Sequence, residues 1–136
     1  GSLNYMQAAF PYMKEQHEGR IINFASATGM FGIAGQLAYG SNKEALRGLT
    51  KIAAKEWGQY GICVNVVLPG AESPAAKAWA EKFPEEYKKQ VMLNPMHRFG
   101  DPEDDIAPVV AFLAGPDSCY YSGQSVIVDG ANSIMP

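Results

Sequence analysis

The chain alternates between stretches with a helical spacing of apolar residues and short runs that are apolar throughout. The spacing predicts helices over residues 3–16, 38–59 and 101–114, and the short runs predict strands over 20–25, 62–68 and 125–128. Because single strands alternate with helices, we expect an α/β fold with a parallel sheet and helices on both faces.

Two of the helices show which residues to expect in the core. Apolar residues recur at three- and four-residue steps, in the second helix as Ala45, Leu46, Leu49, Ile52, Ala53 and Trp57, and in the third as Ile106, Val109, Val110 and Leu113. Each set predicts one buried helix face. Asp101, followed by Pro102, is typical of a helix start, since aspartate caps a helix and proline suits its first turn.

Residues 71–99 differ from the rest, because acids, lysines, prolines and aromatic residues are mixed without a long apolar run. This texture predicts one or two short helices outside the sheet. Before them, Pro69 and Gly70 end the second strand. A glycine-rich stretch, 29–35, predicts an irregular connection after the first strand.

Composition narrows the classes of function. Hydrophobic residues make up 47% of the chain, charged residues 18%, and the net charge is −3, which gives no basic excess for nucleic acid. No apolar run approaches the roughly 20 residues that span a membrane, and the start does not resemble a signal peptide, so we expect a cytoplasmic protein. Cys63 and Cys119 are too few for a disulfide framework, and with His17 and His97 they lack the spacing of a metal site.

The candidate chemistry lies in Tyr39 and Lys43, which a helix places one turn apart on one face. A cation beside a phenol favours its deprotonated form, which suits a proton-transfer role. Ser26, at the end of the first strand, could donate a hydrogen bond to the oxygen of a reacting carbonyl. By itself the Tyr-x-x-x-Lys spacing is more typical of a simple contact on a surface helix, and its surroundings change that balance.

Four stretches, taken together in order and spacing, resemble the short-chain dehydrogenase/reductase family. They are Gly-Arg-Ile-Ile-Asn-Phe-Ala-Ser at 19–26, Tyr-Gly-Ser-Asn-Lys at 39–43, Val-Asn-Val-Val-Leu-Pro-Gly at 64–70 and Ser-Gly-Gln-Ser-Val-Ile-Val-Asp-Gly at 122–130. The resemblance implies the C-terminal portion of a Rossmann-like, doubly wound sheet. It also implies an upstream dinucleotide-binding half, with the family's catalytic asparagine just before Gly1.

The same resemblance implies an exchange of hydride between NAD or NADP and a small-molecule alcohol or carbonyl. Tyr39 would be the acid or base, Lys43 would contact the nicotinamide ribose, and Ser26 would polarise the substrate oxygen. Pro69 and Gly70 would lie along the nicotinamide. The family has a hydroxyl four residues after that glycine to meet the cofactor, whereas here Ser73 follows by three.

Residues 71–99 would be the family's substrate lid, in which Trp79 and Phe83 could contact substrate or serve only in packing. The helices over 1–16 and 38–59 would form the contacts of a dimer or tetramer. The alternative to an enzyme is a non-catalytic subunit or fragment that a partner chain completes. Alternatively, residues 71–99 form a helical segment on the surface that has no gating role.

Overall fold

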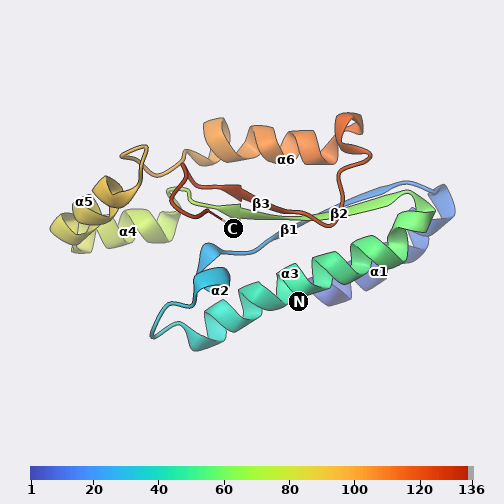
Figure 1. Cartoon of the computed structure of the whole chain (residues 1–136), viewed down its shortest axis with the longest axis horizontal. Coiled ribbons are helices and arrows are strands. Elements are labelled where there is room, and N and C mark those ends of the chain that lie inside the picture. Colours follow the sequence, from blue (N-terminus) through green and yellow to red (C-terminus); the bar gives the residue numbers. More distant parts are fainter. Residues whose placement is uncertain (135–136) are drawn as a thin grey trace.

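The computed structural model describes residues 1–134 and has a three-stranded parallel sheet at its centre (Figure 1). The strands are β1 (Gly19–Phe24), β2 (Ile62–Pro69) and β3 (Ser125–Val128), in the order β1-β2-β3. Gly19 lies opposite Ile62 in the first pair, and Val66 lies opposite Ser125 in the second. The predicted α/β fold with a parallel sheet is confirmed.

Helices cover both faces of the sheet (Figure 1). One face carries α1 (Ser2–Gln16), α2 (Ala27–Phe31) and α3 (Leu37–Trp57), and the other carries α6 (Ala107–Ala114). Two further helices, α4 (Pro74–Lys82) and α5 (Pro84–Leu93), extend beyond the carboxyl ends of the strands. Short helical turns occupy Gly58–Tyr60, Pro102–Ile106 and Pro116–Ser118.

The core is built around β2, which is buried from Ile62 through Leu68. Its even-numbered apolar residues point to the α1 and α3 side, where Val64 packs with Met6 and Ala53. On the same side Phe10 of α1 stacks on Trp57 of α3, with ring centroids 4.6 Å apart. A continuous apolar strand is thus covered on both faces, as the sequence predicted.

The predicted buried face of α3 is wrong at two positions. Ala45 is exposed, and 59% of the Ile52 surface is accessible. The face toward the sheet instead includes Thr50, which is fully buried and accepts a hydrogen bond of 3.0 Å from Asn23 of β1. Apolar spacing could not separate the face that meets the sheet from the adjacent face. In α6, Val109 and Val110 are only partly buried.

The glycine-rich stretch after β1 also differs from the expectation of an irregular connection, because α2 occupies its first part. Gly29 lets this helix approach α3 closely. A Cβ atom at Gly29 would lie 2.8 Å from the backbone nitrogen of Glu44 and 3.0 Å from the oxygen of Gly40. The glycine therefore serves helix packing.

Candidate functional site

The residues predicted to carry chemistry gather at the carboxyl edge of the sheet. A pocket of about 280 Å³ there includes Ser26, which follows β1, and Pro69 and Gly70, which end β2. The residues that complete the lining are Ala27, Thr28, Phe31, Ile33, Leu68, Asn94, Phe99, Asp129, Asn132 and Ser133. Ligands of parallel α/β sheets bind at this edge.

Ser26 follows β1 by two residues and is the N-cap of α2. Its backbone is extended, and its Oγ accepts a hydrogen bond of 3.2 Å from the backbone N–H of Thr28. Serine is a favoured cap because its oxygen satisfies a free N–H of the first turn. The hydroxyl proton is not used in this bond, so it can be donated to an oxygen atom in the pocket.

Tyr39 and Lys43 lie on the first turns of α3, beside this edge. The Nζ of Lys43 donates a hydrogen bond of 2.9 Å to the carbonyl of Phe24, the last residue of β1. The same Nζ lies 5.6 Å from the centroid of the Tyr39 ring, and Tyr39 is 49% exposed. The predicted pair is therefore formed, although neither residue lines the Ser26 pocket itself.

The end of β2 is fixed tightly against the end of β3. The N–H of Gly70 donates to the carbonyl of Val128 at 2.8 Å, and a Cβ at Gly70 would lie 2.5 Å from that of Asp129. Only glycine permits this approach. Ser73 caps α4 by accepting a 3.2 Å hydrogen bond from the N–H of Ala76, and it lies outside the lining of the Ser26 pocket.

Residues 71–99 take the predicted form of two short helices. Trp79 of α4 is 37% exposed, Phe83 between the helices is 41% exposed, and neither lines the Ser26 pocket. Phe99, at the exit from the segment, does line it. Of the three aromatic residues Trp79, Phe83 and Phe99, the one that lines the pocket is therefore Phe99, which the sequence analysis did not select.

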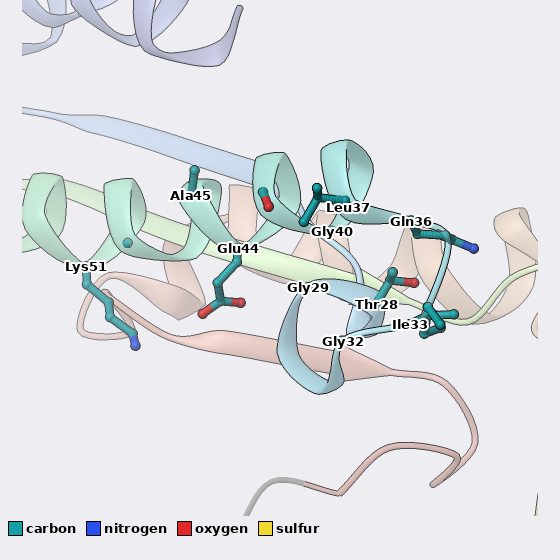
Figure 2. A pocket seen from close by; sticks show the side chains of 13 residues that line it. Thr28, Gly29, Gly32, Ile33, Gln36, Leu37, Gly40, Glu44, Ala45 and Lys51 are labelled. Atoms are coloured by element: carbon teal, nitrogen blue, oxygen red, sulfur yellow. The ribbon is translucent and has the colours of Figure 1, made fainter.

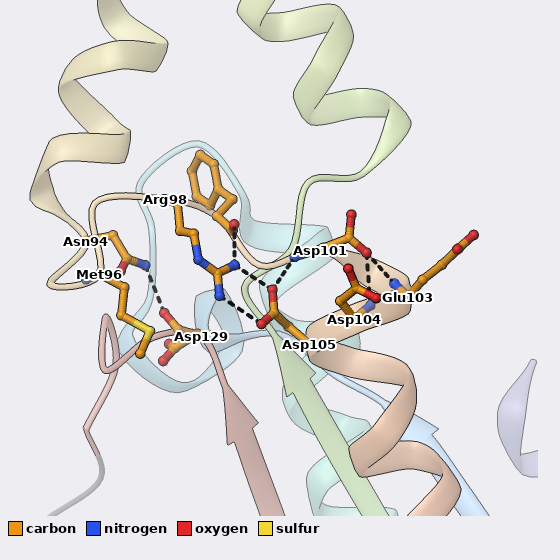
Figure 3. A network of polar contacts seen from close by, with 9 residues as sticks. Asn94, Met96, Arg98, Asp101, Glu103, Asp104, Asp105 and Asp129 are labelled. Atoms are coloured by element: carbon orange, nitrogen blue, oxygen red, sulfur yellow. Dashed lines mark hydrogen bonds and ion pairs between the residues drawn. The ribbon is translucent and has the colours of Figure 1, made fainter.

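The chain returns from these helices to the sheet through a set of charged contacts (Figure 3). Arg98 binds Asp105 through both Nη atoms, with one of the two bonds at 2.8 Å. The hydrogen bonds from Arg98, followed by that from the N–H of Asp101, lower the pKa of Asp105 to about 2. Asp101 in turn accepts hydrogen bonds from the N–H groups of Glu103 and Asp104, which confirms the predicted cap.

Two polar residues of the pocket, Asn94 and Asp129, were not predicted from the sequence as site residues. Asn94 is buried, donates to the carbonyl of Asp129 at 2.8 Å, and accepts from the N–H of Met96 at 2.8 Å (Figure 3). Asp129 directly follows β3, so its place at the carboxyl edge could have been predicted from that position. Asn94 carried no such signal, because only the folding of residues 71–99 brings it there.

A larger pocket, of about 780 Å³, lies elsewhere, between α2 and the outer side of α3 (Figure 2). Its lining includes Gly29, Gly40, Ala45 and Gly48, together with Ile33 and Leu37, but none of Ser26, Tyr39 or Lys43. The larger pocket is therefore not the one that contains a candidate catalytic residue. The smaller pocket is the candidate site, because it holds the Ser26 hydroxyl and lies at the carboxyl ends of the strands.

Two wider features of residues 1–134 bear on the site. Within this range the structure contains no cluster of three or more histidine, cysteine, aspartate or glutamate side chains suited to hold a metal ion. Among the described helices, none is long and apolar enough to cross a membrane.

Comparison with known proteins gives consistent matches along the chain. A family model described as enoyl-(acyl carrier protein) reductase matches residues 1–131. The 12alpha-hydroxysteroid dehydrogenase of a Clostridium species is 44% identical over 132 residues, which cover 97% of this chain and 51% of that protein. The 3-oxoacyl-[acyl-carrier-protein] reductase FabG of Thermotoga maritima is 39% identical over 96% of this chain and 52% of its own length.

Comparison with solved structures also gives matches over most of the chain. ElxO with NADP bound superposes with a TM-score of 0.84 and 31% identity, over 93% of this chain and 51% of that chain. This likeness confirms the predicted Rossmann-like fold class. The chain spans about half the length of the curated relatives it matches.

Proposed function

Because the chain belongs to the short-chain dehydrogenase/reductase family, we propose that residues 1–136 form the C-terminal catalytic part of an oxidoreductase. It interconverts an alcohol and a carbonyl with NAD or NADP, and residues 71–99 are its substrate lid. The hydrogen bond between Lys43 and the carbonyl of Phe24 carries the proposal. It ties the helix that bears Tyr39 to the strand that ends just before Ser26.

Tyr39 exchanges the proton. Its ring is half exposed, so an oxygen atom of a substrate can reach the hydroxyl, and the ammonium of Lys43 lies beside it. In reduction the phenol gives its proton to the substrate oxygen, and in oxidation the phenolate takes the proton of the alcohol.

Ser26 orients the reacting oxygen. The lone pair that caps α2 leaves the hydroxyl proton available, and the cap fixes the side chain against rotation. A donor held in place before reaction stabilises the charge that develops on the oxygen.

The chain's own residues fit a nicotinamide dinucleotide, which supplies or accepts the hydride when bound. Lys43 has three N–H donors, and the carbonyl of Phe24 uses one of them, so two remain for the hydroxyls of a ribose. The backbone of Pro69 and Gly70 lies at the carboxyl edge, where such ligands bind. Ser73 keeps its hydroxyl proton for a further contact with the cofactor.

A dinucleotide-binding half completes this protein, either in the same polypeptide or as a partner chain. Within residues 1–134, β1 pairs on one side only, with β2. An open strand edge favours a further strand at this position.

The face formed by α1 and α3 is our proposed contact between copies of the protein, in a dimer or tetramer. It exposes large apolar side chains, which are Tyr5, Tyr12, Leu37 and Ile52. The pocket of Figure 2 lies along α3 on the same side of the sheet. Small residues there would let a second helix approach closely.

Cytoplasmic location stays a prediction, as do substrate contacts of Trp79 and Phe83 on lid closure.

The alternative, a non-catalytic structural subunit, is less well supported. A structural role has no need of the cation, the phenol and the free hydroxyl proton in one place. The alternative would nevertheless leave the fold and its strand pairing unchanged, so activity must decide between the two.

Tyr39→Phe in the full-length protein tests the proposal. We expect it to keep the circular dichroism spectrum and to lower kcat/KM for carbonyl reduction by about 10²–10⁴-fold, the usual contribution of a general acid. Tyr120→Phe, at a fully exposed tyrosine, is the matched control. Native mass spectrometry with NADH and with NADPH identifies the cofactor. Unchanged turnover in Tyr39→Phe would overturn the assignment.

A further inference from the structure

A short hydrogen bond connects the lid to its own stem. The Oη of Tyr87, on α5, donates to Oε1 of Glu72 at 2.6 Å. Glu72 lies in the connection between β2 and α4, two residues after Gly70. The hydrogen bond to Glu72, together with burial and the negative charge of that carboxylate, raises the pKa of Tyr87. The phenol therefore keeps the proton that it donates.

Glu72 holds a fixed position beside the pocket. Its neighbour Ala71 forms a parallel β-bridge with Gly100, where the chain returns from the lid. The N–H of Glu72 donates to the carbonyl of Gly100 at 2.9 Å, and the N–H of Gly100 donates to the carbonyl of Gly70 at 2.9 Å. Since Gly70 lines the Ser26 pocket, this pairing sets the carboxylate relative to that pocket.

The ring of Tyr87 joins the parts of the lid. It packs edge-on against Trp79 of α4, with centroids 5.8 Å apart, and lies 5.6 Å from the ring of Phe99. Phe99 lines the pocket together with Ser26. One side chain thus touches both lid helices and a wall of the pocket, and its hydroxyl fixes where the ring lies.

Beyond the buried Asn94 at the end of α5, which donates to the carbonyl of Asp129, little else holds the lid in place. Neither α4 nor α5 contains a buried residue, so no core of their own anchors them. Lys77 lies 4.0 Å from Glu72, but 63% of its side chain is exposed, and such surface pairs contribute little. A hydrogen bond to a carboxylate is roughly twice as strong as one between neutral groups. The position of the lid therefore depends strongly on the Tyr87–Glu72 contact.

We propose that Tyr87 and Glu72 form a latch that holds α4 and α5 against Phe99, at the wall of the Ser26 pocket, with Tyr87 as a positioning residue for the bound substrate. The latch rests on the proposed function, since it takes this pocket as the place where the alcohol or carbonyl binds. A closed lid excludes water and retains substrate. Breaking the latch weakens substrate retention and leaves the proton-transfer group intact.

Tyr87→Phe in the full-length protein is the main test, because it keeps the ring contacts and removes only the hydroxyl. Tyr120→Phe, at a fully exposed tyrosine, is the matched control. Hydrogen exchange of residues 74–93 is measured by mass spectrometry, together with kcat and KM. We expect about tenfold faster exchange in the lid, unchanged exchange in β2, and KM raised about tenfold with kcat within about twofold.

A second set of variants keeps the test independent of Tyr87→Phe. Glu72→Ala should produce the same changes, and the double variant should be no worse than either single one, because both remove one contact. Additive effects, or lid exchange and KM equal to those of Tyr120→Phe, would overturn the latch. If the wild-type protein reduces no carbonyl, the proposed function fails, while the exchange measurement still decides whether the latch exists.

Discussion

The ammonium of Lys43 donates a 2.9 Å hydrogen bond to the backbone carbonyl of Phe24. This bond joins the first turns of α3 to the carboxyl end of β1, across 19 positions of sequence. It holds the cation beside the Tyr39 ring and leaves two N–H donors facing away from the strand. A single side chain thus links the helix, the strand end and the proposed cofactor contact.

Lys43→Met should therefore remove activity without unfolding the protein. The variant loses the cation beside the Tyr39 ring and its bond to Phe24, and we expect kcat/KM to fall by about 10²–10⁴-fold. Lys55→Met, at an exposed lysine of the last turn of α3, is the control. Steady-state kinetics at saturating cofactor check this, and equal values for the two variants would contradict the role of Lys43.

Asn65 should be important for stability, and not for chemistry. It is buried on β2, where its Nδ2 donates to the carbonyl of Tyr121 at 2.7 Å and its Oδ1 accepts from the N–H of Gln124 at 3.1 Å. Asn65→Ala leaves both backbone groups without this partner, at a cost of about 1–3 kcal/mol each. Urea unfolding checks this, and exposed Asn42→Ala should be within about 0.5 kcal/mol of wild type.

Ala131 occupies a backbone conformation that favours glycine, with φ of 65°. An L-residue in the left-handed region costs roughly 1–2 kcal/mol, partly offset by the greater freedom of glycine in the unfolded chain. Ala131→Gly should raise the free energy of unfolding by about 0.5–1 kcal/mol. The control, Ala111→Gly in α6, should lower it by a similar amount. A destabilised Ala131→Gly would contradict the expected strain.

The Arg98–Asp105 contact should affect stability in acid. Folding lowers the pKa of Asp105 from its ordinary value of 3.8 to about 2. The folded state therefore favours the carboxylate, and this contribution is complete above about pH 4 and is lost as the pH falls to about 2. Asp105→Asn should be less stable than wild type at pH 6, with the difference disappearing by about pH 2.

Thermal unfolding between pH 6 and pH 2 measures this difference. Glu103→Gln is the control, because within residues 1–134 the Glu103 side chain makes no ion pair or hydrogen bond. A gap between wild type and Asp105→Asn that stays constant down to pH 2 would show that the ion pair does not contribute to folding.

Local sequence patterns determined the elements and the nearest-neighbour geometry of the site. The strand over 125–128 was predicted with the bounds that it has in the structure, because polar turns on both sides limit where a short apolar run can begin and end. The Tyr39–Lys43 pair followed from helical spacing alone, since residues four apart share a face. The cap at Asp101 is also local, because its acceptor and donors lie within three residues.

Only the tertiary structure decided which residues meet across the chain. Periodicity marked Ala45 and Ile52 as apolar but could not show that α3 turns them away from the sheet, because that depends on the other helices. Asn94 and Phe99 reach the Ser26 pocket only through the folding of the lid and its β-bridge at Ala71. Residues that the chain topology brings together have no characteristic spacing in the sequence. The Tyr87–Glu72 bond is such a contact, so it could not be predicted from the sequence.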